Sequence, residues 1–152
     1  MTELRFDRWL LRIDPAATAG AFARIGPGPE TCGCSGCRNF AAVRRRVYPP
    51  EFMELCGRLG VPPGRECEVY HVYRRPDGAH FYGGWIHFVG SVQVAPDARD
   101  YQRRYTQSEF SFYFTSQVIQ VPEALKGLPV AQIEFAFVAP WVLDEPEMTG
   151  SE

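Results

Sequence analysis

The sequence predicts an α+β fold in which two short helices follow a cysteine-rich loop and precede most of a largely antiparallel sheet of about five strands. Three observations support this prediction. Apolar residues recur at helical spacing between residues 38 and 59, they alternate with polar residues after residue 66, and turn signals separate the alternating segments. A run of strands that follows a pair of helices is typical of α+β proteins.

Length and composition predict a single domain over residues 1–152. Hydrophobic residues make up 45% of the chain and charged residues 22%, which is the usual composition of a globular domain. We expect disorder only at about residues 1–2 and 145–152, because chain ends fray and the C-terminal end is acidic and polar. The net charge of −2 argues against a nucleic-acid-binding function, since such proteins present a basic surface.

The chain also predicts a cytoplasmic location without a membrane anchor. Charged residues are too frequent in the first fourteen positions for the core of a signal peptide. The most apolar late segment, residues 133–143, is too short to span a membrane and contains Glu134 and Pro140. In a reducing compartment the five cysteines stay as thiols unless a metal binds them.

The N-terminal third is predicted to be mostly irregular. Residues 3–13 alternate imperfectly and predict one strand, which we expect to end at Asp14-Pro15. The small residues of 16–25 and the run from Gly26 to Pro29 predict irregular backbone up to the cysteine loop.

Two helices are predicted between the cysteine loop and residue 60. Residues 38–47 suit a first helix, which Pro49-Pro50 ends. In the second helix four apolar side chains fall at helical spacing: Phe52, Leu55, Cys56 and Leu59. Gly60 favours a left-handed C-cap, and Pro62-Pro63 prevents the helix from continuing.

The remaining chain predicts strands. Residues 67–74 and 79–89 predict a hairpin around Pro76-Asp77-Gly78, and Gly83-Gly84 indicates a bulge or a close backbone approach. A polar loop at 96–104, a short helical turn and two further strands complete the prediction. These two strands contain alternating apolar residues: Phe110, Phe112 and Phe114 in the first, and Ile133, Phe135 and Phe137 in the second.

The cysteine loop predicts a metal site. Cys32, Cys34 and Cys37 lie within six residues, and the glycines between them allow a turn tight enough for the sulfur atoms to converge. The spacing of Cys34 and Cys37 is typical of structural zinc sites, and Cys32 adds a third thiolate. The start of a helix also favours thiolate over thiol. Zinc is the predicted ion, with Cu(I) as the alternative because three thiolates also suit a soft ion.

Tetrahedral zinc requires a fourth ligand, for which the predicted hairpin offers candidates. Cys67 and His71 lie on one face of the first hairpin strand because they are four residues apart. Cys67 ranks first, since it would complete a closed four-cysteine site. Cys56 ranks lower because it fits the apolar stripe of a helix. His80 and His87 on the returning strand are weaker options.

Histidines and tyrosines also share a face of this hairpin. If Pro76-Asp77 forms the turn, His71 lies opposite Tyr82, and Tyr73 lies opposite His80. Such a face suits a ligand pocket or an acid–base site. It is more typical of a half-buried sheet surface whose polar tips are satisfied, and this is the favoured interpretation.

These features predict a small cytosolic domain that is stabilised by zinc and binds a protein or a small molecule. The alternative is a metal- or thiol-dependent enzyme that uses Cys32, Cys34 and Cys37 with a hairpin histidine. Thiol–disulfide exchange at Cys34-Ser-Gly-Cys37 is a third interpretation. The sequence contains no Gly-rich phosphate loop after a strand and no hydrolase or metalloprotease signature, so it predicts neither a substrate nor a reaction.

Overall fold

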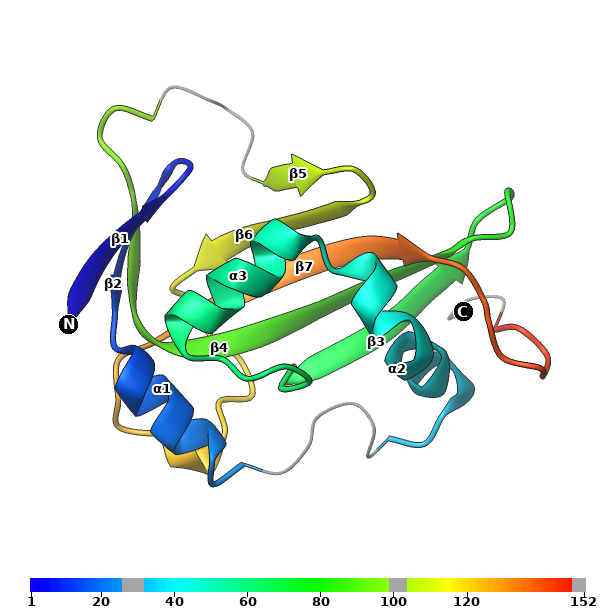
Figure 1. Cartoon of the computed structure of the whole chain (residues 1–152), viewed down its shortest axis with the longest axis horizontal. Coiled ribbons are helices and arrows are strands. Elements are labelled where there is room, and N and C mark those ends of the chain that lie inside the picture. Colours follow the sequence, from blue (N-terminus) through cyan, green and yellow to red (C-terminus); the bar gives the residue numbers. More distant parts are fainter. Residues whose placement is uncertain (26–31, 99–103, 149–152) are drawn as a thin grey trace.

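The computed structural model describes residues 1–25, 32–98 and 104–148. Within these ranges the chain forms seven strands, three α-helices and a short 3-10 helix at Glu123–Leu125 (Figure 1). The predicted α+β class with a mostly antiparallel sheet is therefore confirmed, although the strands outnumber the five expected and the helices outnumber the two expected.

Every strand pair in the sheet is antiparallel. The strands are β1 (Thr2–Phe6), β2 (Trp9–Ile13), β3 (Glu68–Arg74), β4 (His80–Val94), β5 (Tyr105–Gln107), β6 (Phe110–Thr115) and β7 (Val130–Ala139). The long strand β4 organises the sheet. It pairs with β7 along 80–89, with β3 along 80–85 and with β2 along 90–94. The order β1-β2-β4-β7-β6-β5 follows, with β3 beside β4.

Residue chemistry at the helix ends explains where the helices begin and end. The helices are α1 (Pro15–Phe22), α2 (Ser35–Val47) and α3 (Pro50–Leu59). Asp14 caps α1 by accepting a hydrogen bond from the backbone N–H of Ala17 at 3.0 Å. Helix α3 starts with Pro50 and ends at Gly60, whose φ of 85° is the left-handed conformation predicted for this glycine.

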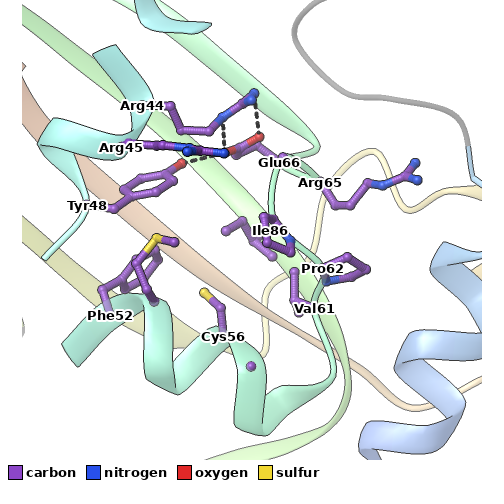
Figure 2. A pocket seen from close by; sticks show the side chains of 14 residues that line it. Arg44, Arg45, Tyr48, Phe52, Cys56, Val61, Pro62, Arg65, Glu66 and Ile86 are labelled. Carbon is purple, nitrogen blue, oxygen red and sulfur yellow. Dashed lines mark hydrogen bonds and ion pairs between the residues drawn. The ribbon is translucent and has the colours of Figure 1, made fainter. Parts of the chain in front are cut away.

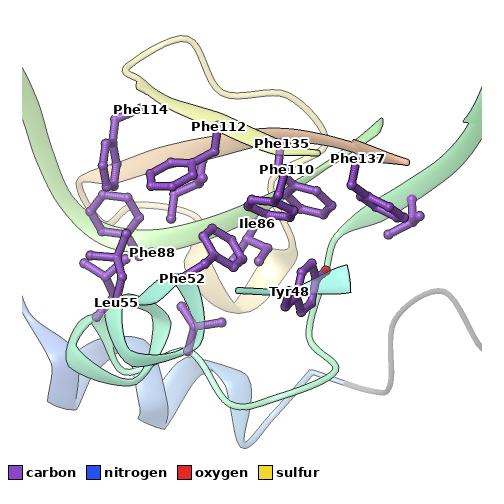
Figure 3. Packing of buried hydrophobic residues seen from close by; sticks show 14 of the residues in the cluster. Tyr48, Phe52, Leu55, Ile86, Phe88, Phe110, Phe112, Phe114, Phe135 and Phe137 are labelled. Carbon is purple, nitrogen blue, oxygen red and sulfur yellow. The ribbon is translucent and has the colours of Figure 1, made fainter. Parts of the chain in front are cut away.

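The hydrophobic core lies between one face of the sheet and helices α2 and α3 (Figures 1 and 3). Alternating phenylalanines of β6 and β7 point toward Phe52 and Leu55 of α3 and toward Tyr48 (Figure 3). The ring centroid of Phe52 lies 4.7 Å from that of Phe110 and 5.2 Å from that of Phe112. The alternation that predicted these strands therefore also defines the buried face.

Two predictions for the N-terminal third are wrong. Residues 3–13 form a hairpin and not one strand, because the chain reverses at Asp7, whose φ is +50°. Residues 16–25 are not irregular throughout, because Asp14-Pro15 begins α1 instead of only ending a strand. The predicted irregular run from Gly26 to Pro29 lies outside the described residues.

The β3–β4 hairpin forms as predicted, with one change in register. His71 lies opposite Tyr82, but a bulge between His71 and Tyr73 places Tyr73 opposite Phe81 and not opposite His80. Gly84 is a site of close approach, since a Cβ atom there would lie 2.5 Å from the carbonyl oxygen of Glu68. Of the predicted loop at 96–104, positions 99–103 lie outside the described residues, as do 149–152 of the predicted disordered tail.

None of the helices in the described ranges is both long and apolar enough to cross a membrane.

Candidate metal centre

The cysteine loop runs directly into the first turn of α2. Cys34 is the N-cap of this helix, and its Sγ accepts a hydrogen bond from the backbone N–H of Cys37 at 3.3 Å. Gly33, with a φ of +76°, provides the backbone reversal that brings Cys32 beside them. The helix therefore begins three residues earlier than the predicted start at residue 38, and its N-terminal dipole lies at the thiols.

The three cysteines form a group that can hold a metal ion. The sulfur atoms of Cys32, Cys34 and Cys37 all lie within 4.8 Å of one another. Two thiolates bound to tetrahedral zinc at about 2.3 Å would lie about 3.8 Å apart, so the sulfur atoms are already close to the separation that zinc requires. No other group of three possible ligand residues within the described ranges brings its ligand atoms this close.

The environment shifts the pKa values of Cys34 and Cys37 in opposite directions. Burial is the largest single influence on the pKa of Cys34 and raises it. Hydrogen bonds from the backbone of Cys37, from the thiols of Cys37 and Cys32 and from the backbone of Gly36 outweigh burial, so the pKa of Cys34 is lowered. Cys37 is 7% exposed, and burial, followed by its two neighbouring thiols, strongly raises its pKa. Its Sγ faces the carbonyl oxygen of Val69 at 4.0 Å. Cys34 is therefore easier to ionise than an ordinary thiol, whereas Cys37 is harder to ionise.

Polar side chains of α2 and β4 hold the loop in place. The guanidinium of Arg38 donates to the carbonyl oxygen of Gly33 at 3.2 Å and to both carboxylate oxygens of Glu145 at 2.8 and 2.7 Å. The hydroxyl of Tyr82 on β4 donates to the carbonyl oxygen of Gly36 at 3.1 Å. These contacts fix both glycines of the loop against distant parts of the chain.

Asn39 connects the same turn to the end of β7. This side chain is 0% exposed, and its Nδ2 donates to the hydroxyl of Tyr82 at 3.2 Å and to the carbonyl oxygen of Pro140 at 3.1 Å. Its Oδ1 accepts from the backbone N–H of Val142 at 2.8 Å. Sequence reasoning did not identify Arg38, Asn39 or Glu145, because their partners lie in segments far apart in the sequence.

His71 lies against the first turn of α2. A Cβ atom at Gly36 would be 3.3 Å from Cβ of His71, so the glycine allows β3 to approach the cysteine loop. Nε2 of His71 lies 2.8 Å from Nδ1 of His80, and Nε2 of His80 lies 3.3 Å from a carboxylate oxygen of Glu147. Arg74 pairs with the other oxygen of Glu147 at 3.1 Å. The result is a carboxylate–histidine–histidine chain that ends at Nδ1 of His71.

The hydrogen bonds fix where the protons of this chain lie when both rings are neutral. The carboxylate of Glu147 only accepts, so Nε2 of His80 carries a proton and its Nδ1 accepts one from Nε2 of His71. Nδ1 of His71 then carries a lone pair. This atom is buried and has no hydrogen-bond partner in the described part of the chain. Burial, followed by the neighbouring His80, lowers the pKa of His71, which favours its neutral form.

The other predicted ligands lie elsewhere. Sγ of Cys67 donates to the carbonyl oxygen of Gln120 at 3.5 Å and is not part of the three-sulfur group. Cys56 lines a cavity beside α3. His87 lies on the opposite face of the sheet and bonds to Gln132 and to the carbonyl oxygen of Ile119. The prediction that Cys67 supplies the fourth ligand stays a prediction.

No protein-family model, curated protein or solved structure matches this chain.

Proposed function

We propose that Cys32, Cys34 and Cys37 bind one zinc ion together with Nδ1 of His71, and that this ion stabilises the part of the fold around α2. The observation that carries this proposal is the convergence of the three cysteine sulfur atoms within 4.8 Å. His71 is not part of this group, but its Nδ1 is buried without a partner in the described part of the chain, and its Cβ packs against Gly36 of the loop. Thiolates and neutral imidazole are the ligands that zinc prefers, and three cysteines with one histidine make a common structural site.

The hydrogen-bonded histidine chain supports His71 over Cys67 as the fourth ligand. A histidine that binds a metal through one ring nitrogen almost always donates a hydrogen bond from the other, which fixes the orientation of the ring. Nε2 of His71 makes such a contact to His80, and Glu147 in turn holds His80. Cys67 already has a contact to Gln120.

A structural role is favoured because the loop joins segments that are far apart in the sequence. Arg38 and Asn39 tie the first turn of α2 to residues 140–145, and His71 would tie it to β3 through the ion. Metal binding at such a site adds directly to the free energy of folding. We further propose that the domain acts in the cytoplasm, where its thiols stay reduced, as a module that binds a protein or a small molecule.

Cobalt substitution tests the ligand set. Tetrahedral Co²⁺ bound by thiolates gives visible bands and sulfur-to-metal charge-transfer absorption, so titration of the metal-free protein with Co²⁺ reports ligand type directly. We expect Cys34→Ser to abolish tight binding and the matched control Cys56→Ser to preserve it. His71→Ala should weaken binding at least about tenfold, whereas Cys67→Ser should leave it unchanged.

The opposite pattern, with Cys67→Ser weakened and His71→Ala unaffected, would reassign the fourth ligand to Cys67. Copper in place of zinc in the protein as purified would overturn the identity of the ion. Circular dichroism of Cys34→Ser separates the two roles of the site. Loss of tertiary structure supports structural zinc, and a variant as stable as the wild type contradicts it.

A further inference from the structure

A cavity of about 440 Å³ lies beside α3 (Figure 2), and no residue of the cysteine loop lines it. The C-terminal part of α2, one side of α3 and the segment that leads from Gly60 into β3 enclose it. Its volume falls within the range of small-molecule sites in proteins, about 300–1,000 Å³. Phe52, Val61 and Ile86 give it an apolar lining, as Figure 2 shows.

One wall of the cavity is a preorganised polar cluster. Glu66 is 2% exposed, and its two carboxylate oxygens accept hydrogen bonds from Nε and Nη2 of Arg44, each at 3.1 Å. The hydroxyl of Tyr48 donates to the same carboxylate at 2.7 Å. Burial, followed by the charge of Glu66, raises the pKa of Tyr48, so this hydroxyl remains a neutral donor. The contacts satisfy the buried carboxylate and hold the Arg44 side chain in place.

The charge around the cavity is unbalanced. Three arginines and one carboxylate line it, which leaves an excess of two positive charges. The ion pair with Arg44 neutralises the charge of Glu66. Arg65 donates to the carbonyl oxygen of Ile25 at 2.5 Å, and this uncharged acceptor does not neutralise the positive charge of the guanidinium. Arg45 is exposed at the rim. A guanidinium at the mouth of an apolar cavity is complementary to a carboxylate attached to an apolar body.

The cavity thiol does not favour covalent chemistry. Burial, followed by the charge of Glu66, raises the pKa of Cys56 to about 12, so the group stays a thiol near neutral pH. Its sulfur adds polarisable apolar surface to the lining instead of a nucleophile. The cavity therefore has the properties of a binding site for an apolar group next to a guanidinium.

We propose that this cavity binds a small organic anion with an apolar body, of the class of medium-chain or aromatic carboxylates. The apolar part packs against Phe52, Val61 and Ile86, and the carboxylate lies at the rim with Arg45. The site is separate from the cysteine loop, so this inference stands independently of the proposed zinc ion.

Gly57 offers a way to fill the cavity without disturbing the fold. It lines the cavity within α3, and a Cβ atom built on it meets no atom within 4 Å. Gly57→Leu therefore places a side chain in open space, and leucine also suits a helix better than glycine does. The variant should fold at least as stably as the wild type while leaving less room for a ligand.

Isothermal titration with decanoate, 1-naphthoate and uncharged decan-1-ol tests the proposal. We expect saturable one-to-one binding of at least one carboxylate and much weaker binding of the alcohol. Arg45→Gln should weaken carboxylate binding about tenfold, and Gly57→Leu should abolish it. Arg46→Gln, which changes an exposed neighbour that does not line the cavity, should bind like the wild type.

Three results would overturn the proposal. The first is that neither carboxylate shows saturable binding. The second is that decanoate and decan-1-ol bind with equal affinity. The third is that a Gly57→Leu variant with native circular dichroism binds the carboxylates as the wild type does. Zinc content measured on the same samples keeps this test distinct from that of the metal site, because neither Arg45→Gln nor Gly57→Leu should change it.

Discussion

The two ends of the helix-covered sheet face are packed in different ways. At the α3 end, Phe52 contacts rings from β6 and β7 with centroids 4.7 to 6.0 Å apart, so packing between aromatic rings dominates. At the α2 end, the buried side chains of Asn39, Tyr82 and His80 make hydrogen bonds. Shape complementarity stabilises the first end, and satisfied polar atoms stabilise the second.

This difference points to where the chemistry of the molecule lies. At the α2 end one buried nitrogen, Nδ1 of His71, has no partner within the described residues, and the cysteine loop packs beside it. An aromatic core offers nothing for a metal to bind, whereas this polar end offers sulfur and nitrogen ligands. Variants at the two ends should therefore affect stability and metal binding differently.

The largest expected effect is at the aromatic end. Phe52→Ala should lower the free energy of unfolding by about 3–5 kcal/mol, because it leaves a cavity among the rings of β6 and β7. Urea denaturation measures the loss. Zinc content of the folded protein should not change, and neighbouring Met53→Ala, which truncates an exposed side chain, should stay within about 0.5 kcal/mol of the wild type. Loss of zinc in folded Phe52→Ala would show that the two ends are not independent.

A smaller loss of stability with a loss of metal affinity is expected for Asn39→Ala. The change leaves the carbonyl of Pro140 and the N–H of Val142 without their side-chain partner, at a cost of about 1–3 kcal/mol. Because Asn39 holds the first turn of α2, Co²⁺ affinity should fall as well. Arg46→Ala on the exposed side of the same helix serves as the control. If Asn39→Ala is destabilised but keeps the Co²⁺ affinity of the wild type, the contacts of Asn39 do not support the metal site.

Tyr82→Phe should have a milder effect of the same kind. The variant keeps the ring, which stacks on Phe137 with centroids 5.2 Å apart, and loses only the hydroxyl contacts to Gly36 and Asn39. A loss of about 0.5–1.5 kcal/mol is expected from urea denaturation. Dissociation of Co²⁺ into excess chelator should be faster than in the wild type. The exposed Tyr73→Phe should change neither quantity, and an equal change in both variants would contradict the role of the Tyr82 hydroxyl.

The smallest effect is expected at His87 and only below neutral pH. Burial lowers the pKa of His87, although its hydrogen bonds to Ile119 and Gln132 partly oppose this. The unfolded state, with an ordinary histidine pKa near 6.5, therefore binds a proton first as the pH falls. Stability should decrease below about pH 6.5, and less steeply in His87→Gln. Parallel curves of unfolding free energy against pH for the two proteins would contradict this assignment.

The fold was predictable where local signals agree with tertiary packing. The alternating phenylalanines of β6 and β7 and the helix stop at Gly60 required no distant information. The β1–β2 hairpin was missed because its reversal uses Asp7 at positive φ, without the Asn-Gly or Asp-Gly pair that normally marks such a turn. Helix α1 was missed because Asp14-Pro15 can either end a strand or cap and begin a helix.

The site was predictable only in its local part. The three cysteines converge within six residues through Gly33 and the start of a helix, so spacing alone indicates the group. The chain from Glu147 through His80 to His71 joins residues from three separate segments. No short-range pattern encodes such a contact.

The most direct test of the central claim is elemental analysis of the purified protein, combined with thiol counts before and after chelation. The account predicts about one zinc per chain, with Cys32, Cys34 and Cys37 protected from alkylation until the ion is removed. The ion should be absent from Cys34→Ser and retained in Cys56→Ser. Wild-type protein without bound metal and with five freely reactive thiols, or equal zinc content in Cys34→Ser, would contradict it.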